Sequence, residues 1–233
     1  TGSSFTNCSV VAFDTEAFGG ALFSFGYLAR TIVERTTFAG CTAVSYRAPR
    51  MAAGGAVMLV GGPTARFFDC TFDGCSARAT TGNTYESYHK NQYLGAYGGA
   101  LHSSLAALTM VRCVISNCST VAAIGAGGGA ISSFFGDWDS TSEEYELVGE
   151  SSQAEPSTLT NLTIRDCRCE CASVYSNETL DNPQLFGHNT SRGGAVLLRD
   201  SNLVITVQGT LIEGCTVVGG VALGGGIFAI NGP

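Results

Sequence analysis

The sequence predicts an all-β fold, a parallel β-helix (solenoid) of about six coils with loop inserts, on the basis of three observations. Two short strings alternate along the whole chain at an interval of about 33 residues, which lengthens in three units that carry inserts. The segments between them are short and strand-like, separated by turn residues, without a helical period. With 31 Gly and 13% charged residues in 233, the composition also disfavours a helical domain.

The first string is Gly-Gly-Ala followed by an aliphatic residue, with Gly-Gly-Gly-Ile as its last variant. Its six copies begin at Gly19, Gly54, Gly98, Gly128, Gly193 and Gly224. Paired glycines are typical of a corner where one backbone passes close to another. The alanine that follows is small enough to stack inside a coil, so we expect one corner of every coil here.

The second string is a bulky apolar residue three places before a cysteine. The apolar residues are Phe5, Phe38, Phe72, Ile115, Ile164 and Ile212. The residues directly before the cysteines are Asn7, Gly40, Gly74, Asn117, Asp166 and Gly214, which belong to the types that tolerate a positive φ. We therefore expect a second recurrent corner, and an aromatic ladder of three phenylalanines about one strand spacing apart.

Stacking explains why the strings repeat. A unit of two or three short strands cannot bury its own apolar face, whereas stacked units bury a continuous column. A flat β-sandwich with Gly-rich turns is the alternative, but it gives no reason for a fixed repeat. We interpret residues 1–233 as a single β-helical domain, and the start at Thr1 without a signal peptide as a sign of a fragment of a larger protein.

The two strings resemble the polymorphic outer membrane protein repeat, in which Gly-Gly-Ala-(Ile, Leu or Val) alternates with Phe-x-x-Asn. The resemblance covers essentially the whole chain, although cysteine takes the family's asparagine place in the second string. It implies a right-handed parallel β-helix, an extracellular setting and, more weakly, an adhesive role. The chain looks like an algal or protist relative, because nothing in it resembles a membrane barrel.

The ten cysteines are an even number, and stacking predicts how they can pair. Equivalent residues of adjacent coils have Cα atoms about 4.8 Å apart, within the span of about 4.4 to 6.8 Å that a disulfide requires. Cys70 and Cys113 lie five residues before the recurrent cysteines of neighbouring coils, so we expect a bridge between them. The recurrent column can pair as Cys8–Cys41, Cys75–Cys118 and Cys167–Cys215, or in the register Cys41–Cys75 and Cys118–Cys167.

Two questions about the cysteines remain open, and a zinc site is set aside. Cys169 and Cys171 remain to form a disulfide with each other or with neighbouring cysteines. The alternative to disulfides is a stack of buried thiols that act as small hydrophobic residues. A zinc site is not expected, because the Cys-x-Cys-x-Cys run lacks a second ligand pair at suitable spacing.

Five N-x-Ser/Thr sequons predict glycosylation, at Asn7, Asn117, Asn161, Asn177 and Asn189. The last two fall in an insert, where an oligosaccharide can be accommodated. Asn7 and Asn117 occupy expected corners, where either a glycan or the turn itself explains the residue. Together with the cysteine content, the sequons predict a secretory route and an extracellular or cell-surface location.

Three polar, irregular inserts interrupt the repeat, at about residues 76–97, 132–156 and 168–192. Loops on a rigid scaffold commonly carry recognition. The first insert contains Tyr85, Tyr88 and Tyr93, amphipathic side chains suited to contact sugar or protein. The second contains Trp138, the only tryptophan, which we expect to anchor a neighbouring subunit. Its acidic side chains lack an EF-hand pattern, which favours a solvated loop over a calcium site.

Several function classes are disfavoured. A net charge of −7 gives no basic footprint for nucleic acid, and the chain has no run of apolar residues long enough for a membrane span. Enzymes with this fold that cleave acidic polysaccharides use clustered carboxylates. Here Asp69 and Asp166 fall in different columns of non-adjacent coils, and the three histidines are scattered. We expect no catalytic residues, no metal and no cofactor.

The remaining interpretation is a structural or interaction module of an extracellular protein, such as a fibre, wall or adhesive appendage. Its expected partners are other protein chains or further coils of the same protein, N-linked glycans and, as a further candidate, carbohydrate. The alternative is a polysaccharide-binding or polysaccharide-cleaving enzyme, a lyase or hydrolase. The two differ in whether the inserts bury against neighbouring chains or converge on a cleft with several carboxylates.

Overall fold

The computed structural model describes residues 2–13, 15–26, 29–46, 51–61, 64–80, 95–104, 107–123, 125–134, 157–171, 190–199 and 205–230. These residues form strands β1 to β29, and the described part of the chain contains no helix. The strands make five parallel sheets, which we call A to E. Sheets A to D each receive one strand from all six coils, and sheet E receives one from each of the first five.

The strand bounds follow the sheets. Sheet A contains β1 (Ser4–Thr6), β6 (Thr37–Ala39), β11 (Thr71–Asp73), β16 (Val114–Ser116), β21 (Thr163–Arg165) and β26 (Leu211–Glu213). Sheet B contains β2 (Ser9–Ala12), β7 (Thr42–Ser45), β12 (Ser76–Ala79), β17 (Ser119–Ala122), β22 (Arg168–Cys171) and β27 (Thr216–Val218). Sheet C contains β3 (Ala17–Phe18), β8 (Met51–Ala53), β13 (Gly95–Tyr97), β18 (Gly125–Gly127), β23 (Thr190–Arg192) and β28 (Val221–Leu223). Sheet D contains β4 (Leu22–Phe25), β9 (Val57–Val60), β14 (Leu101–Ser104), β19 (Ile131–Phe134), β24 (Val196–Arg199) and β29 (Ile227–Ile230). Sheet E contains β5 (Arg30–Glu34), β10 (Thr64–Phe68), β15 (Ala107–Val111), β20 (Ser157–Thr160) and β25 (Ile205–Gln208).

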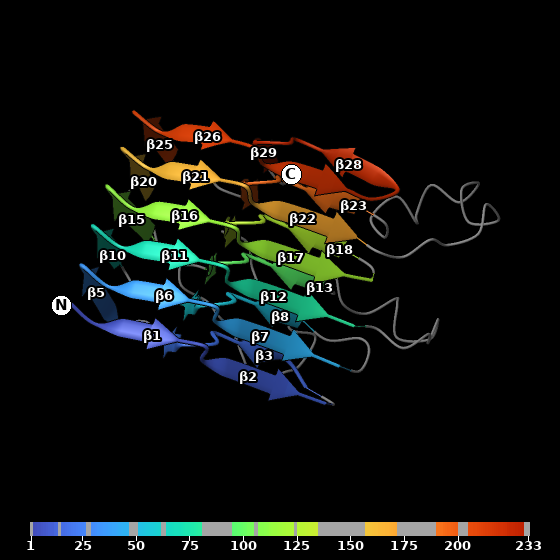
Figure 1. Ribbon diagram of the computed structural model, residues 1–233, viewed down its shortest axis with the longest axis horizontal. Coiled ribbons are helices and arrows are strands. Elements are labelled where there is room, and N and C mark those ends of the chain that lie inside the picture. Colours follow the sequence, from blue (N-terminus) through green and yellow to red (C-terminus); the bar gives the residue numbers. More distant parts are fainter. Residues whose placement is uncertain are drawn as a thin grey trace.

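Each coil passes through the sheets in the order A to E, so β1 to β5 form coil 1 and β26 to β29 form coil 6. Every strand pairs in parallel with the equivalent strand of the next coil, as Figure 1 shows for the stacked strands of sheets A and B. The predicted parallel β-helix of about six coils is confirmed. Each of coils 1 to 5 contains five strands, whereas the sequence indicated two or three. The additional strands escaped the sequence analysis because short segments such as Met-Ala-Ala of β8 have little strand propensity of their own.

The aromatic ladder is confirmed. The Phe38 ring stacks on Phe5 with centroids 5.2 Å apart and on Phe72 with centroids 4.8 Å apart, at interplanar angles of 6° and 8°. Ile115 and Ile164 continue the column in coils 4 and 5, and both are fully buried. The ladder lies in the largest core cluster, which draws residues from sheets A, D and E.

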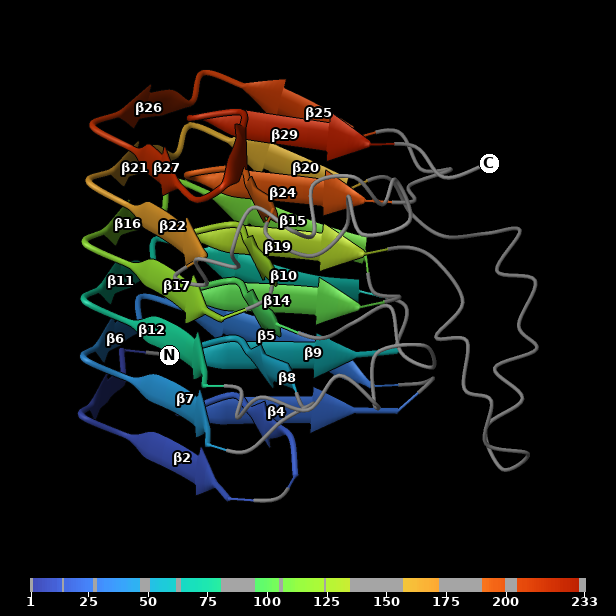
Figure 2. The ribbon, with the colours of Figure 1, turned by 90° about the vertical axis from the view of Figure 1, so that its right-hand side faces the viewer.

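Two smaller apolar clusters lie beside this core. One consists mainly of alanines from facing strands of sheets B and C, among them Ala77 and Ala96. The other joins sheets C and D on the faces turned away from the main core, and includes Met58, Tyr97 and Phe134. Figure 2 shows the sheet D strands, β4, β9, β14, β19, β24 and β29, lying one over another.

Both predicted corners are confirmed. All six residues that precede the recurrent cysteines have φ between 53° and 63°. At the other corner the coils approach so closely that a Cβ on Gly55 would lie 2.6 Å from the backbone nitrogen of Ser76 in the next coil. The alanines that follow the paired glycines in coils 2 to 5 are fully buried in the main core.

The inserts are narrower than the sequence suggested. Strands β12 and β13 occupy the two ends of the first expected insert, β19 occupies the start of the second, and β22 and β23 occupy the ends of the third. These segments pair in register with the coils on either side, which is why they belong to the scaffold.

Candidate functional site

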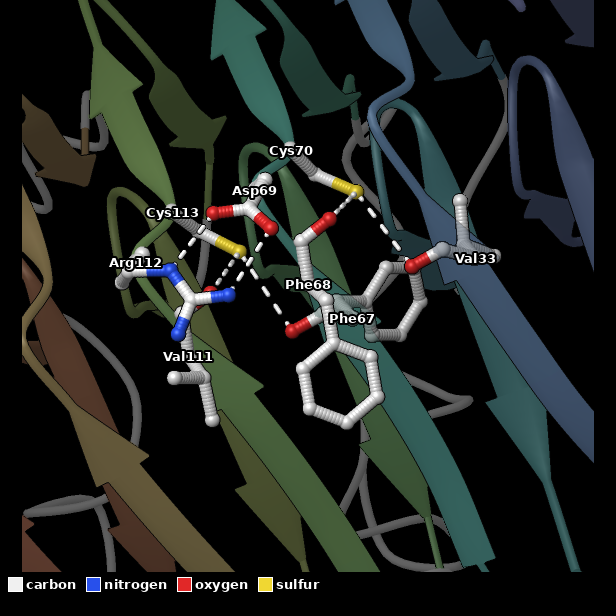
Figure 3. Close-up of polar contacts among 8 residues, drawn as sticks. All are labelled: Val33, Phe67, Phe68, Asp69, Cys70, Val111, Arg112 and Cys113. Atoms are coloured by element: carbon white, nitrogen blue, oxygen red, sulfur yellow. Dashed lines mark hydrogen bonds and ion pairs between the residues drawn. The ribbon is translucent and has the colours of Figure 1, made fainter. Parts of the chain in front are cut away.

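An ion pair links two corners of neighbouring coils between sheets E and A (Figure 3). The Arg112 guanidinium donates through Nε to Oδ1 of Asp69 at 2.7 Å and through Nη2 to Oδ2 at 2.9 Å. Both residues have a φ of 53°, so the two corners present their side chains alike. Hydrogen bonding from Arg112 lowers the pKa of Asp69, which therefore stays ionised and engaged. The pair is an exposed brace between coils.

A second carboxylate is held in the same manner between coils 3 and 4. Oδ1 of Asp73 accepts a hydrogen bond from Ser116 Oγ at 2.7 Å and another from Asn117 Nδ2 at 2.8 Å. These donors lower the pKa of Asp73. Both acidic side chains thus bond to the next coil.

Asp69 and Asp166 lie at different corners of non-adjacent coils, as the sequence indicated. In the described ranges, no group of three or more His, Cys, Asp or Glu side chains is placed to hold a metal ion. The expected partner-contact residues of the inserts lie outside the described residues, namely Tyr85, Tyr88, Tyr93 and Trp138.

Three of the five sequons fall within the described residues. Asn7, Asn117 and Asn161 are all exposed and all have positive φ, between 53° and 55°. The Asn117 amide is engaged with Asp73 of the preceding coil. Asn177 and Asn189 lie outside the described residues. The described asparagines are exposed and also serve their corners.

The structure corrects the expected disulfides. All ten cysteines carry thiols. The bridge expected between Cys70 and Cys113 is absent, and so is either register of the recurrent column, Cys8, Cys41, Cys75, Cys118, Cys167 and Cys215. In-register parallel strands hold the side chains of a column parallel, so the Cβ atoms are also about 4.8 Å apart. A disulfide needs a Cβ to Cβ distance of about 3.5 to 4.5 Å, and Cα spacing alone was too permissive a criterion.

Neighbouring thiols of a column hydrogen-bond to each other, as Cys70 does with Cys113, and every thiol except those of Cys169 and Cys171 also meets backbone carbonyls in a repeated pattern. Cys70 Sγ donates to the carbonyl of Phe68 two residues before it, at 3.3 Å, and approaches that of Val33 in the preceding coil at 3.5 Å. Cys113 makes the equivalent contacts one coil further on, and Figure 3 shows the two thiols side by side. The recurrent cysteines repeat this arrangement, for example Cys75 with Phe38 and Asp73.

Burial raises the pKa of Cys41 and of Cys169 to about 11, and it raises that of Cys118 well above the ordinary value. Hydrogen bonding with a neighbouring thiol has the opposite effect on two others, lowering the pKa of Cys70 to about 7 and that of Cys167 to about 4. Eight of the ten cysteines are buried, and only Cys8 and Cys215 in the end coils are partly exposed. The columns therefore act as packing elements, the alternative that the sequence left open.

A buried histidine was missed by the sequence argument. His102 on β14 is fully buried on the outer side of sheet D, with Nδ1 3.1 Å from Ser132 Oγ. Its ring meets that of Phe134 edge-on, with centroids 4.9 Å apart at 84°. Nε2 has no hydrogen-bond partner, and burial lowers the pKa of His102 to about 3. The available signal was its position directly after the inward Leu101, which assigns it to the opposite face of the strand.

Comparison of the chain with protein-family models, curated proteins and solved structures gives no match. The resemblance to the polymorphic outer membrane protein repeat therefore rests on the two strings alone. In the described part of the chain no helix is long and apolar enough to cross a membrane.

Proposed function

We propose that the chain is a structural and interaction module of an extracellular protein, a glycosylated β-helical segment of a fibre, wall or adhesive appendage. The observation that carries the proposal is the use of polar corner side chains as braces between coils. Asp69 bonds to Arg112, and Asp73 bonds to Ser116 and Asn117, each across one coil interface. Such contacts stiffen a scaffold and leave these carboxylates without a free acid or base role.

The exposed sequon asparagines support the extracellular part of the proposal. A glycan on Asn7 or Asn161 projects from a corner into solvent, so it is compatible with the stacked coils. The low share of charged residues, 13%, is also compatible with a surface that sugars or neighbouring chains cover in part.

Secretion from a eukaryotic host tests the glycosylation. We expect a mass decrease on enzymatic removal of N-glycans and conversion of Asn7, Asn117 or Asn161 to aspartate at the occupied sites. The matched controls are Ser9→Ala, Ser119→Ala and Thr163→Ala, which abolish each sequon but keep the asparagine that the corner uses. A secreted, folded chain without any glycan contradicts the glycosylated extracellular module.

Incubation with acidic and neutral polysaccharides tests the absence of catalysis. We expect neither unsaturated products nor new reducing ends. Release of either by the purified chain, with loss of the activity on Asp69→Asn or Asp73→Asn, overturns the proposal in favour of a lyase or hydrolase. These variants remove a brace at an exposed position, so the coils remain folded.

A further inference from the structure

Two cysteines stack on each other at the corner between sheets E and A. The register of the strands on either side, β10 with β15 and β11 with β16, places Cys70 and Cys113 at equivalent positions of adjacent coils. Both side chains are buried. Figure 3 shows that the two side chains point the same way. The two sulfur atoms therefore follow one another along the direction in which the coils stack.

The pair has no further sulfur above or below it. The preceding coil places Thr36 at this position and the following coil places Leu162, and both are buried. The Thr36 hydroxyl donates to the carbonyl of Glu34 at 3.0 Å. In the part of the chain that the structure describes, no third His, Cys, Asp or Glu side chain is placed to join the pair around a metal ion. An ion bound between the two thiols thus has two protein ligands.

The spacing of the pair matches an ion with two ligands in line. Side chains that point the same way in adjacent coils repeat at about 4.8 Å, which is far wider than a sulfur–sulfur bond of about 2 Å. A bond from a metal ion to a thiolate is about 2.3 Å long, so two such bonds in line span about 4.6 Å. A small rotation of either side chain about its Cα–Cβ bond adjusts the remaining difference.

The ligand type and number select the ion. Soft thiolate ligands favour Cu(I), for which two thiolates in line are a complete ligand set. Zinc was set aside because it takes four ligands, and that reason does not apply to Cu(I). We propose that Cys70 and Cys113 bind one Cu(I) ion in a two-coordinate site between adjacent coils.

Binding is a ligand exchange without a change of oxidation state. Two S–H bonds break, two Cu–S bonds form and two protons pass to the solvent, so the bound unit carries one net negative charge. The Arg112 guanidinium lies close enough to Cys113 for charge on that thiol to raise the pKa of Arg112, and its positive charge offsets part of the negative charge. Each cysteine directly follows an exposed corner residue, Asp69 or Arg112, so the site lies one residue from the surface.

Titration of the reduced 233-residue chain with Cu(I) tests the proposal, without oxygen and in competition with a chromophoric Cu(I) chelator. The recurrent cysteines have the same spacing, so the parent chain is expected to bind more than one equivalent. The double variant Cys70→Ala with Cys113→Ala should bind one equivalent fewer than the parent. Extended X-ray absorption fine structure of the copper lost in this variant, taken as a difference, should show two sulfur ligands at about 2.3 Å.

The matched control is Cys169→Ala with Cys171→Ala. It also removes two buried thiols, but these follow one another along β22, about 6.6 Å apart, and in the adjacent coils they face residues other than cysteine. This control should bind as many equivalents as the parent.

Single serine variants keep the test open if the double variant does not fold. Cys70→Ser and Cys113→Ser each preserve the size of the side chain and remove one thiolate. Each should lose the same single equivalent as the double variant, because one thiolate does not complete the site. Circular dichroism of the copper-free chains verifies that the coils are formed.

Three results overturn the inference. The first is an equal number of Cu(I) equivalents in the parent and in the folded Cys70 and Cys113 variants. The second is the loss of an equivalent in the Cys169 and Cys171 control as well, which indicates binding to thiols regardless of stacking. The third is a ligand set of three or more sulfur atoms, or of nitrogen or oxygen atoms, for the copper that the variant loses. The proposed function does not depend on these results and fails separately if the chain cleaves polysaccharide.

Discussion

Substitution of Gly55 by alanine tests how tightly the coils approach at the glycine corner. The new Cβ would lie 2.6 Å from the backbone nitrogen of Ser76 and nearer still to the carbonyl oxygen of Gly99. Both are backbone atoms, so no flexible side chain can move aside. Relief of the Ser76 contact alone to about 3.4 Å requires coil 3 to move by roughly 0.8 Å, and relief of the Gly99 contact requires more, because interiors are close-packed.

A shift of that size reaches the hydrogen bonds around the corner. Gly55 donates to Gly98 at 3.1 Å, Ala56 donates to Ala100 at 3.0 Å and Ser76 donates to Cys41 at 2.9 Å. A lengthening of roughly 0.8 Å takes all three donor–acceptor distances beyond the range of a useful hydrogen bond. At about 0.5 to 1.5 kcal/mol for each hydrogen bond, with overpacking strain of about 1 to 3 kcal/mol, the expected loss of unfolding free energy is about 2.5 to 7.5 kcal/mol.

Guanidinium unfolding followed by circular dichroism measures this loss as a decrease of the transition midpoint at constant slope. Gly225→Ala is the control in dilute solution, because its Cβ meets nothing closer than 3.8 Å, and its stability should stay within about 0.5 kcal/mol of the parent's or rise slightly. Equal stabilities of Gly55→Ala and Gly225→Ala would refute the close approach of the coils at this corner.

Three further predictions follow from the core, the buried histidine and the thiols. Phe38→Ala should cost about 3 to 5 kcal/mol in the same unfolding assay, because it empties a fully buried site between two stacked rings, whereas Phe38→Leu should cost less than half as much; similar costs would exclude the ladder as a source of stability. Burial lowers the pKa of His102 to about 3 from 6.5, so between these values only the unfolded chain takes up the proton, and stability should be full above pH 6.5 and decrease by about 1.4 kcal/mol per pH unit as the pH falls toward 3. His102→Met should lack this slope between about pH 6.5 and 4.5, where Asp69 and Asp73 stay ionised, and an unchanged slope would contradict the assignment. Alkylation followed by mass spectrometry should label Cys8 and Cys215 first in the folded chain and all ten thiols after unfolding without reductant; fewer than ten would reveal bridges.

The features that repeat in every coil could be predicted from the sequence. A positive φ at Asn7 or Asp166 and the stacking of Phe5 on Phe38 follow from residue type and interval alone. Strand number could not be predicted, because β8 and β13 form only when the neighbouring coils supply their hydrogen bonds. His102 was missed for a related reason, since its burial depends on sheet C and D contacts that lie outside the periodic strings.

The failure of the predicted disulfides explains how this β-helix is held together. A column stacks well only if successive side chains point the same way, and that alignment holds neighbouring Cβ atoms about one coil spacing apart. The condition that stacks Phe5, Phe38 and Phe72 therefore leaves Cys70 and Cys113 in contact but without a disulfide. Without disulfides between coils, each coil is stabilised by the packing and backbone hydrogen bonds of the coils stacked on it.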